Sequence, residues 1–145
     1  MNVEIINNPL DLHVYGFSAT AIGRDYAGTA LKLMDKMWKI VKSNNLPNKR
    51  INIWVYGPGE KVFAGVELEG TINAAVDLEL KNITLDHYAY YKHIGPYALI
   101  KKVGQEMREE LKEKGLEITT PYIERYGHWT NNQMKLETEL LIALT

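Results

Sequence analysis

The sequence contains no cysteine, which excludes disulfide bonds, thiol catalysis and cysteine-ligated metal sites. No apolar run approaches the ~20 residues that a membrane-spanning helix needs, and the start of the chain does not resemble a signal peptide. The formal net charge is only −1, so the composition offers no electrostatic basis for binding nucleic acid or an anionic membrane. We therefore expect a cytoplasmic protein that contacts neither of them directly.

Catalytic and metal-binding motifs are also scarce. Ser18 and Ser43 are the only serines, and neither stands in a Gly-x-Ser-x-Gly nucleophile context. No two of the four histidines (His13, His87, His93 and His128) have His-x-x-x-His spacing. The sequence therefore predicts no metal site and no cofactor.

The chain has an ordinary globular composition with an unusual choice of aromatic residues. Its 145 residues are 46% hydrophobic and 24% charged, which suits one domain over residues 1–145 with a substantial core. It has nine tyrosines and three tryptophans but only two phenylalanines. Because Tyr and Trp combine an apolar ring with a hydrogen-bonding group, this bias indicates a binding site.

Two segments have the three- and four-residue hydrophobic spacing of amphipathic helices. The apolar stripe of the first consists of Leu31, Met34, Trp38 and Val41, so we expect Trp38 to lie in the core. The stripe of the second consists of Ile100, Val103, Met107 and Leu111. Pro96 at its start and Gly115 after its end are typical helix boundaries.

Strand-like patterns occupy most of the remaining chain, at residues 12–22, 51–56, 62–69, 84–94, 119–126 and 136–144. The order strand-helix-strand-strand therefore occurs twice, in residues 12–70 and 84–144. The amino-acid sequence supports this repeat, since IWVYG at 53–57 is followed 70 residues later by IERYG at 123–127. We expect an α+β fold with duplicated β-α-β-β modules and pseudo-twofold symmetry. Two helices would cover an antiparallel sheet, with a ligand cleft between the halves.

The segment PYIERYG, residues 121–127, raises a question about function. In a strand, alternate side chains share a face, so Tyr122, Glu124 and Tyr126 lie on one side. The repeat brings Trp54 and Tyr56 to the same place. The opposite face, which we expect to be core under the helices, consists of Ile51, Ile53, Val55 and Ile123, with Arg125 at the strand's end or rim.

Two interpretations of this face are open. Aromatic rings around one carboxylate offer apolar walls and an anion, which is what an amphipathic cation needs. Alternating polar and aromatic residues are also common on the open face of an antiparallel sheet, where cross-strand aromatic pairs stabilise the ladder.

A resemblance to a known family favours the first interpretation. The segment from Tyr90 to Trp129 reads YYKHIGPYALIKKVGQEMREELKEKGLEITTPYIERYGHW and is followed by ETELLIAL. It is similar to the GyrI-like small-molecule-binding family, which includes the effector-binding domains of AraC-type and MerR-type regulators. The shared pattern consists of His93, Gly95, Pro96, Tyr97, Gly115, Pro121, Glu124, Tyr126, Thr138 and Glu139.

The resemblance implies a pair of strand-helix-strand-strand modules with Glu124 at the centre of a pocket. The expected ligand-binding residues are Glu124, Tyr126, Tyr122, Trp54, Tyr56, Tyr97, His93 and Trp129. His93 either forms a hydrogen bond near the helix entry or lines the pocket rim, and Trp129 either packs against its loop or closes over the ligand. The family's regulators carry a helix-turn-helix region ahead of this domain. Only about ten residues precede the first strand here, so we expect a stand-alone member without direct DNA contact.

The resemblance leaves three functions open. The first is binding of an amphipathic, cationic small molecule or xenobiotic, in the manner of a multidrug-binding protein. The second is hydrolysis of cyclopropanoid DNA-alkylating compounds inside the same aromatic cage, with Glu124 and Tyr126 or Tyr97 orienting a water. The third is an interaction with DNA gyrase. Exposed strand edges could in addition pair two copies as a homodimer.

Overall fold

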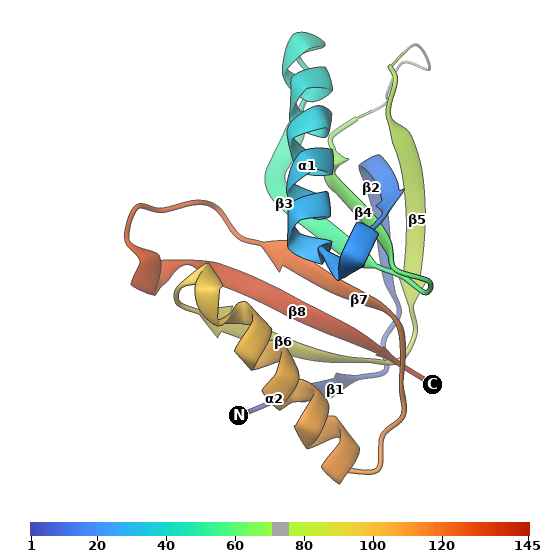
Figure 1. The fold of residues 1–145 in the computed structure, drawn as a ribbon, viewed down its shortest axis with the longest axis vertical. Coiled ribbons are helices and arrows are strands. Elements are labelled where there is room, and N and C mark those ends of the chain that lie inside the picture. The colour runs from blue at the N-terminus through green and yellow to red at the C-terminus, as the bar shows by residue number, and fades with distance from the viewer. Residues whose placement is uncertain (71–75) are drawn as a thin grey trace.

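The computed structural model describes residues 1–70 and 76–145 and contains two α-helices and eight strands (Figure 1). The helices are α1 (Tyr26–Ser43) and α2 (Ile100–Glu113). The strands are β1 (Glu4–Ile6), β2 (Leu10–Thr20), β3 (Asn48–Tyr56), β4 (Lys61–Leu68), β5 (Glu79–Leu85), β6 (Tyr88–Ile94), β7 (Ile118–Tyr126) and β8 (Glu137–Leu144). Within the described residues, no helix is both long and apolar enough to cross a membrane.

The strands form one antiparallel sheet in the order β1-β6-β8-β7-β3-β4-β2-β5. The chain therefore has the α+β architecture that the sequence predicts. The first strand-helix-strand-strand segment contributes one side of the sheet and the second contributes the other. They meet where β3 pairs with β7, in the middle of the sheet.

Two strand predictions differ from the structure. The predicted strand at 84–94 is two strands, β5 and β6, which are separated by a bend at Asp86 and His87. This bend has neither Gly nor Pro, so the alternating pattern continues across it. Strand β1 was not predicted, because a segment of three residues is too short to show a period.

Helix α1 confirms the predicted stripe at Met34, Trp38 and Val41, which are buried or pack against the core, but not at Leu31. The residues that it buries are Ala30, Met37 and Val41, whereas Leu31 is 47% exposed. The prediction for Leu31 was wrong because the small side chain of Ala30 carries little weight in a hydrophobic pattern, yet it allows the helix to approach the sheet closely.

Trp38 lies at the edge of the core and is half-buried. Its indole Nε1 donates a hydrogen bond to Asn52 Oδ1 at 2.7 Å, which ties α1 to β3. The polar end of the ring thus has a partner while the apolar part packs against the buried side chains below it.

Helix α2 confirms the predicted stripe. Ile100, Met107 and Leu111 are buried, and Val103 packs against them. A short 3-10 turn that follows Pro96 leads into the helix. At the other end Gly115 has a φ of +73° and its N–H bonds back to the helix, as a C-terminal glycine should.

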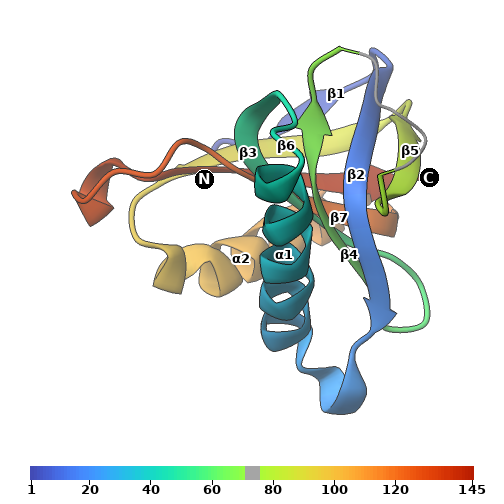
Figure 2. The same ribbon diagram turned by 90° about the horizontal axis from the view of Figure 1, so that it is seen from above.

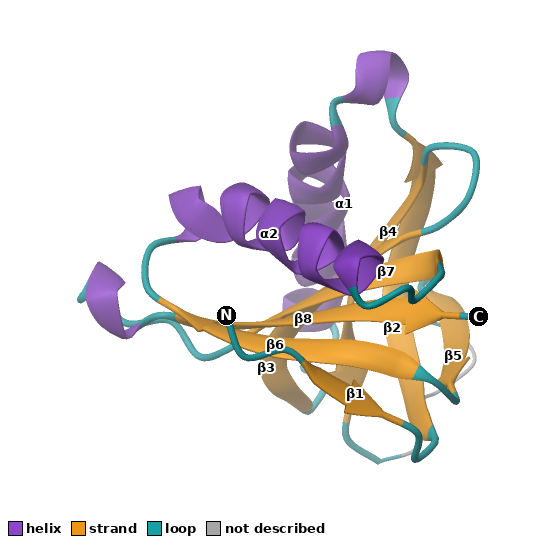
Figure 3. Ribbon diagram, turned by 90° about the horizontal axis from the view of Figure 1, so that it is seen from below, coloured by secondary structure: helices purple, strands orange, loops and turns teal. Residues whose placement is uncertain are grey.

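Both helices cover the same face of the sheet, as Figures 2 and 3 show. The residues of α2 pack with Leu140 and Ile142 of β8, and those of α1 pack with Trp54 and Ala64. Trp54 is paired with Glu124 across β3 and β7. The helices therefore lie on the face that carries Glu124.

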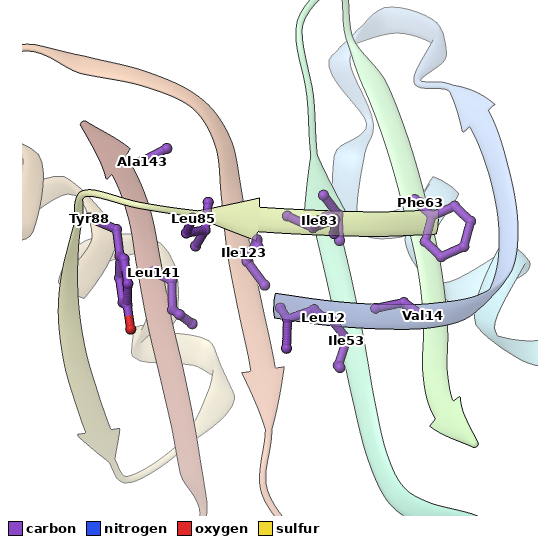
Figure 4. Close-up of a cluster of buried hydrophobic side chains, with 11 residues drawn as sticks. Leu12, Val14, Ile53, Phe63, Ile83, Leu85, Tyr88, Ile123, Leu141 and Ala143 are labelled. Carbon is purple, nitrogen blue, oxygen red and sulfur yellow. The ribbon is translucent and has the colours of Figure 1, made fainter. Parts of the chain in front are cut away.

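The prediction that Ile53, Val55 and Ile123 lie under the helices is therefore wrong. These residues belong to a separate core on the other face of the sheet (Figure 4), together with Leu12, Val14, Phe63, Ile83, Leu85, Tyr88, Leu141 and Ala143. Ile51 packs at the edge of this core. The sheet curves so strongly that β5 side chains reach those of β7 and β8, which are not its neighbours in strand order. The sheet thus covers this apolar face with its own strands.

Candidate functional site

The pairing of β3 with β7 brings the predicted site residues together at the centre of the sheet. Trp54 lies opposite Glu124, and Tyr56 lies opposite Tyr122. Tyr126 is two residues further along β7, so strand alternation puts it on the same face. We refer to Trp54, Tyr56, Tyr122, Glu124 and Tyr126 as the Glu124 cluster. In Figure 1, β7 passes between α1 and α2, which lie apart over the two ends of the sheet.

The Glu124 carboxylate accepts hydrogen bonds from three tyrosine hydroxyl groups. Tyr126 donates to Oε1 at 2.6 Å, Tyr122 donates to Oε2 at 2.7 Å, and Tyr56 donates to Oε1 at 3.4 Å. The residue is only 7% exposed. None of the ion pairs within residues 1–70 and 76–145 involves Glu124. A nearly buried carboxylate is therefore held by neutral donors alone.

These tyrosines keep their protons to high pH. Burial, followed by the Glu124 charge and the hydrogen bonds to it, raises the pKa of Tyr56, Tyr122 and Tyr126 far above the usual value for tyrosine. Burial alone raises the pKa of Tyr97. Since a tyrosinate could not donate to the carboxylate, the raised pKa values maintain the three hydrogen bonds under ordinary conditions.

The rings of the cluster pack against one another in edge-on and stacked arrangements. Trp54 and Tyr126 meet edge to face at 4.9 Å between centroids, and Tyr56 stacks on Tyr122 at 5.6 Å. Tyr97 meets Tyr126 at 5.4 Å from the turn before α2. Such pairs fix ring positions and each contributes roughly 0.5–1.5 kcal/mol beyond burial.

Tyr26, in the first turn of α1, extends the cluster and was missed by the sequence analysis. Its ring meets Tyr56 edge to face at 5.9 Å. Tyr26 follows Ile22 and Gly23 much as Tyr97 follows Ile94 and Gly95, so the repeat contained the signal that could have identified it.

The remaining predicted residues, His93 and Trp129, have different environments. His93 is buried, and its ring Nε2 lies 3.0 Å from the Pro96 carbonyl oxygen, to which it can donate in the appropriate tautomer. This is the predicted hydrogen bond at the helix entry. Trp129, in the connection between β7 and β8, is 74% exposed. Its predicted role over the ligand stays a prediction.

Two buried polar atoms on this face have no hydrogen-bond partner among the described residues. They are Nε1 of Trp54 and Oγ1 of Thr138, which is paired across the sheet with both Tyr126 and His93. Trp54 is 9% exposed and Thr138 is fully buried. A buried polar group without a partner costs about 1–3 kcal/mol, so each is an unusual feature.

A surface hollow of about 470 Å³ lies away from the Glu124 cluster. It is lined in part by Val55, Phe63 and Ile83, on the face opposite the helices, with Lys61 and Lys81. It includes none of the predicted site residues. Among residues 1–70 and 76–145, no group of three His, Asp or Glu side chains is placed to hold a metal ion.

Comparison with known proteins identifies the fold through structure only. No protein-family model matches the sequence, and no curated protein matches it either. Among solved structures, the EcmrR C-terminal domain superposes with a TM-score of 0.77 at 13% sequence identity, covering 100% of this chain and 99% of that one.

Two further structures share the fold over nearly the whole chain. SAV2435, solved bound to tetraphenylphosphonium, has a TM-score of 0.67 at 15% identity, covering 100% of this chain and 94% of that one. A protein described as a hydrolase from Listeria innocua has a TM-score of 0.59 at 14% identity, covering 99% and 91% respectively. At these identities the likeness shows a shared fold, which is that of the EcmrR C-terminal domain and SAV2435.

Proposed function

We propose that the Glu124 cluster binds an amphipathic, cationic small molecule on the face between α1 and α2. The observation that carries this proposal is the state of the Glu124 carboxylate, which is 7% exposed and, within residues 1–70 and 76–145, bonded only to neutral hydroxyl groups. A nearly buried carboxylate without an ion-pair partner interacts strongly with a positive ligand, because the surroundings screen the attraction poorly.

The aromatic rings supply the other half of the recognition. Trp54, Tyr56, Tyr122 and Tyr126 form an aromatic cage whose ring faces attract a cation and whose apolar area accepts lipophilic groups. SAV2435, which has the same fold, was solved with tetraphenylphosphonium, a ligand that combines one positive charge with four phenyl rings. The chemistry of that ligand matches the combination of an acid and rings in this cluster.

The indole of Trp54 supports a ligand at the same place. Trp54 lies opposite Glu124 across the sheet, and its buried Nε1 has no acceptor among the described residues. A ligand oxygen would satisfy this donor, so the cluster offers one directed hydrogen bond in addition to charge and apolar area.

We further propose that the site formed at the junction of two duplicated modules. The pairing irregularity between Asn48 and Asn52 in the first half has a counterpart 70 residues later, between Ile118 and Tyr122. The ends of the helices also correspond, since Asn45 and Gly115, 70 positions apart, both have positive φ values. With this offset Trp54 corresponds to Glu124, its own cross-strand partner. That correspondence supports a pseudo-twofold axis through the cluster.

The test compares two ligands of similar shape, the cation methyltriphenylphosphonium and the neutral triphenylphosphine oxide, by isothermal titration calorimetry. We expect the wild-type protein to prefer the cation. Glu124→Gln should weaken cation binding about 30-fold or more, which corresponds to roughly 2 kcal/mol for a buried charge pair, and should weaken binding of the oxide far less.

Glu139→Gln is the matched control, because it makes the same chemical change on the other face of the sheet. We expect it to leave both affinities unchanged. Equal losses for the cation and the oxide in Glu124→Gln would remove the role of charge from the proposal.

Hydrolysis is a second candidate, supported by the shared fold of the Listeria innocua protein described as a hydrolase. The substrate would carry a cyclopropane conjugated to a carbonyl. A water oxygen would bond to a ring carbon as the strained carbon–carbon bond breaks, and the electron pair of that bond would move to the carbonyl oxygen, which takes up a proton. Glu124 would orient the water and accept its proton, with Tyr126 beside it.

Mass spectrometry separates the two candidates. Many ring-opened product molecules per protein molecule would support hydrolysis. Binding of one intact substrate molecule per protein would support the binding function alone.

A further inference from the structure

Helix α2 contains a glycine in its buried face, where alanine would stabilise the helix better. A Cβ atom placed on Gly104 would lie 3.1 Å from Nη1 of Arg108, one turn later, and 3.6 Å from the Tyr122 hydroxyl. The first distance is tighter than ordinary contact, so a Cβ at position 104 would force the Arg108 guanidinium to shift by a few tenths of an ångström. Gly104 thus allows Arg108 to lie against Tyr122.

Arg108 places a positive charge beside the Glu124 cluster. Its Cζ atom lies 4.7 Å from the centre of the Tyr122 ring, a cation–π contact. The hydroxyl of the same tyrosine donates to Glu124 at 2.7 Å. One ring therefore has an anion at its hydroxyl end and a cation over its face. The pKa of Tyr122 reflects both, since burial and Glu124 raise it and Arg108 lowers it.

Arg108 has no acidic partner in the part of the chain that the structure describes. None of the ion pairs and hydrogen bonds found in residues 1–70 and 76–145 involves its guanidinium group. By contrast, Arg125 on the other face is paired with Glu139. A guanidinium presents five N–H donors in a plane, which suits a carboxylate held by two hydrogen bonds.

We infer that the Glu124 cluster selects zwitterionic amphiphiles, whose cationic group binds at Glu124 and whose carboxylate binds Arg108. This inference rests on the proposed function and names its ligand class. A ligand with only a positive charge is repelled by Arg108, whereas a ligand that also carries a carboxylate gains a second ion pair. Arg108 is then the residue that determines charge specificity, and Gly104 is a positioning residue that acts through it.

The test uses rhodamine 110 and rhodamine 123, which is its methyl ester. The two dyes share one cationic ring system, but only rhodamine 110 has a free carboxylate at neutral pH. Fluorescence anisotropy titration should show that the wild-type protein binds rhodamine 110 at least about tenfold more tightly. Arg108→Gln should weaken rhodamine 110 binding about tenfold and leave rhodamine 123 binding unchanged or up to about threefold tighter.

Gly104→Ala provides a second variant that does not depend on losing a charged side chain. Alanine favours the helix, which offsets the cost of the tight contact, so the melting temperature should stay close to that of the wild type. Its Cβ would push the guanidinium by a few tenths of an ångström, so the preference for rhodamine 110 should fall about two- to fivefold. A merely structural role for Gly104 would not change the ratio of the two affinities. Arg108→Lys, which keeps the charge without the planar group, should retain part of the preference.

The outcomes separate this inference from the function on which it rests. A wild-type preference for rhodamine 123 overturns the inference, and so does an equal change of both affinities in Arg108→Gln. If methyltriphenylphosphonium binds through Glu124 while rhodamine 110 does not bind, the zwitterion inference fails and the cation-binding function stands. If no cation binds at all, both fail.

Discussion

Glu124 and Glu139 lie on neighbouring strands, β7 and β8, but on opposite faces of the sheet. Both accept hydrogen bonds from tyrosine, since Tyr90 donates to Glu139 at 2.5 Å in the way that Tyr122 and Tyr126 donate to Glu124. The two carboxylates differ in whether a cationic side chain forms an ion pair with them. Arg125 Nε lies 3.2 Å from Glu139 Oε1, and no such pair involves Glu124 in the described residues.

This difference is why we propose Glu124, rather than Glu139, as the acid that binds a ligand. The charge of Glu139 is balanced within the protein by Arg125. The charge of Glu124 is stabilised by hydroxyl dipoles, which satisfy its oxygens without neutralising it. A cationic ligand has the most to gain at the second kind of carboxylate, so the comparison explains why we place the site at Glu124.

Alkaline pH should cause the largest loss of stability among these tests. Tyr56, Tyr122 and Tyr126 have raised pKa values in the folded protein, so they keep protons that the unfolded chain loses above its ordinary tyrosine pKa of about 10. Their stabilising contribution is complete below pH ~10 and is lost as the pH rises further. At about pH 11 the loss in the free energy of unfolding is roughly 1.4 kcal/mol for each of these tyrosines, or about 4 kcal/mol for the three together. Urea unfolding followed by circular dichroism at a series of pH values measures this loss.

Two phenylalanine variants measure how much each face of the sheet contributes to the loss of stability at high pH. Tyr126→Phe should remove roughly 1.4 kcal/mol of the loss at about pH 11, the share of one tyrosine. Tyr90→Phe should remove a similar share from the other face, because burial and Glu139 raise the pKa of Tyr90 well above this pH although Arg125 lowers it. If Tyr126→Phe left the alkaline loss unchanged, the three hydroxyl groups would not be coupled to Glu124 as described.

Removing the cation of Glu139 should have the next largest effect, and only on stability. Arg125→Met keeps the apolar stem but leaves Glu139 without its partner. The two side chains are 21% and 31% exposed, between a surface pair and a buried one, so we expect a loss of about 2 kcal/mol in the free energy of unfolding. Calorimetric affinity for methyltriphenylphosphonium should change less than about twofold. A large loss of affinity would show that the two acids are not independent.

The sequence predicts most of the fold because its elements have clear periods. The stripe of α2 and its end at Gly115 are confirmed. The bend at Asp86 was missed, since nothing in its composition interrupts the alternation. Alternation also says which residues share a face, but it does not say what covers each face. The aliphatic face of β3 and β7 was assigned to the helices, whereas the curved sheet covers it with its own strands.

The site is predictable to the extent that it lies on two strands. Alternation groups Tyr122, Glu124 and Tyr126, and the repeat brings Trp54 to the same place, as the pairing of β3 with β7 confirms. Arg108 could not be found in this way, because its contact with Tyr122 depends on how α2 lies over the sheet and on the space left at position 104. Such contacts come from packing rather than from any period in the sequence.

Trp129, in the connection between β7 and β8, provides the smallest test. Its ring is 74% exposed, so it has little packing to lose, and Trp129→Ala should change the free energy of unfolding by less than about 0.5 kcal/mol. We expect this variant to weaken binding of methyltriphenylphosphonium about threefold, since an exposed indole that closes over a ligand would bury apolar area only in the complex. Met134→Ala is the matched control, because Met134 lies in the same connection and is 69% exposed. An affinity that Trp129→Ala leaves unchanged would confine recognition to the residues around Glu124.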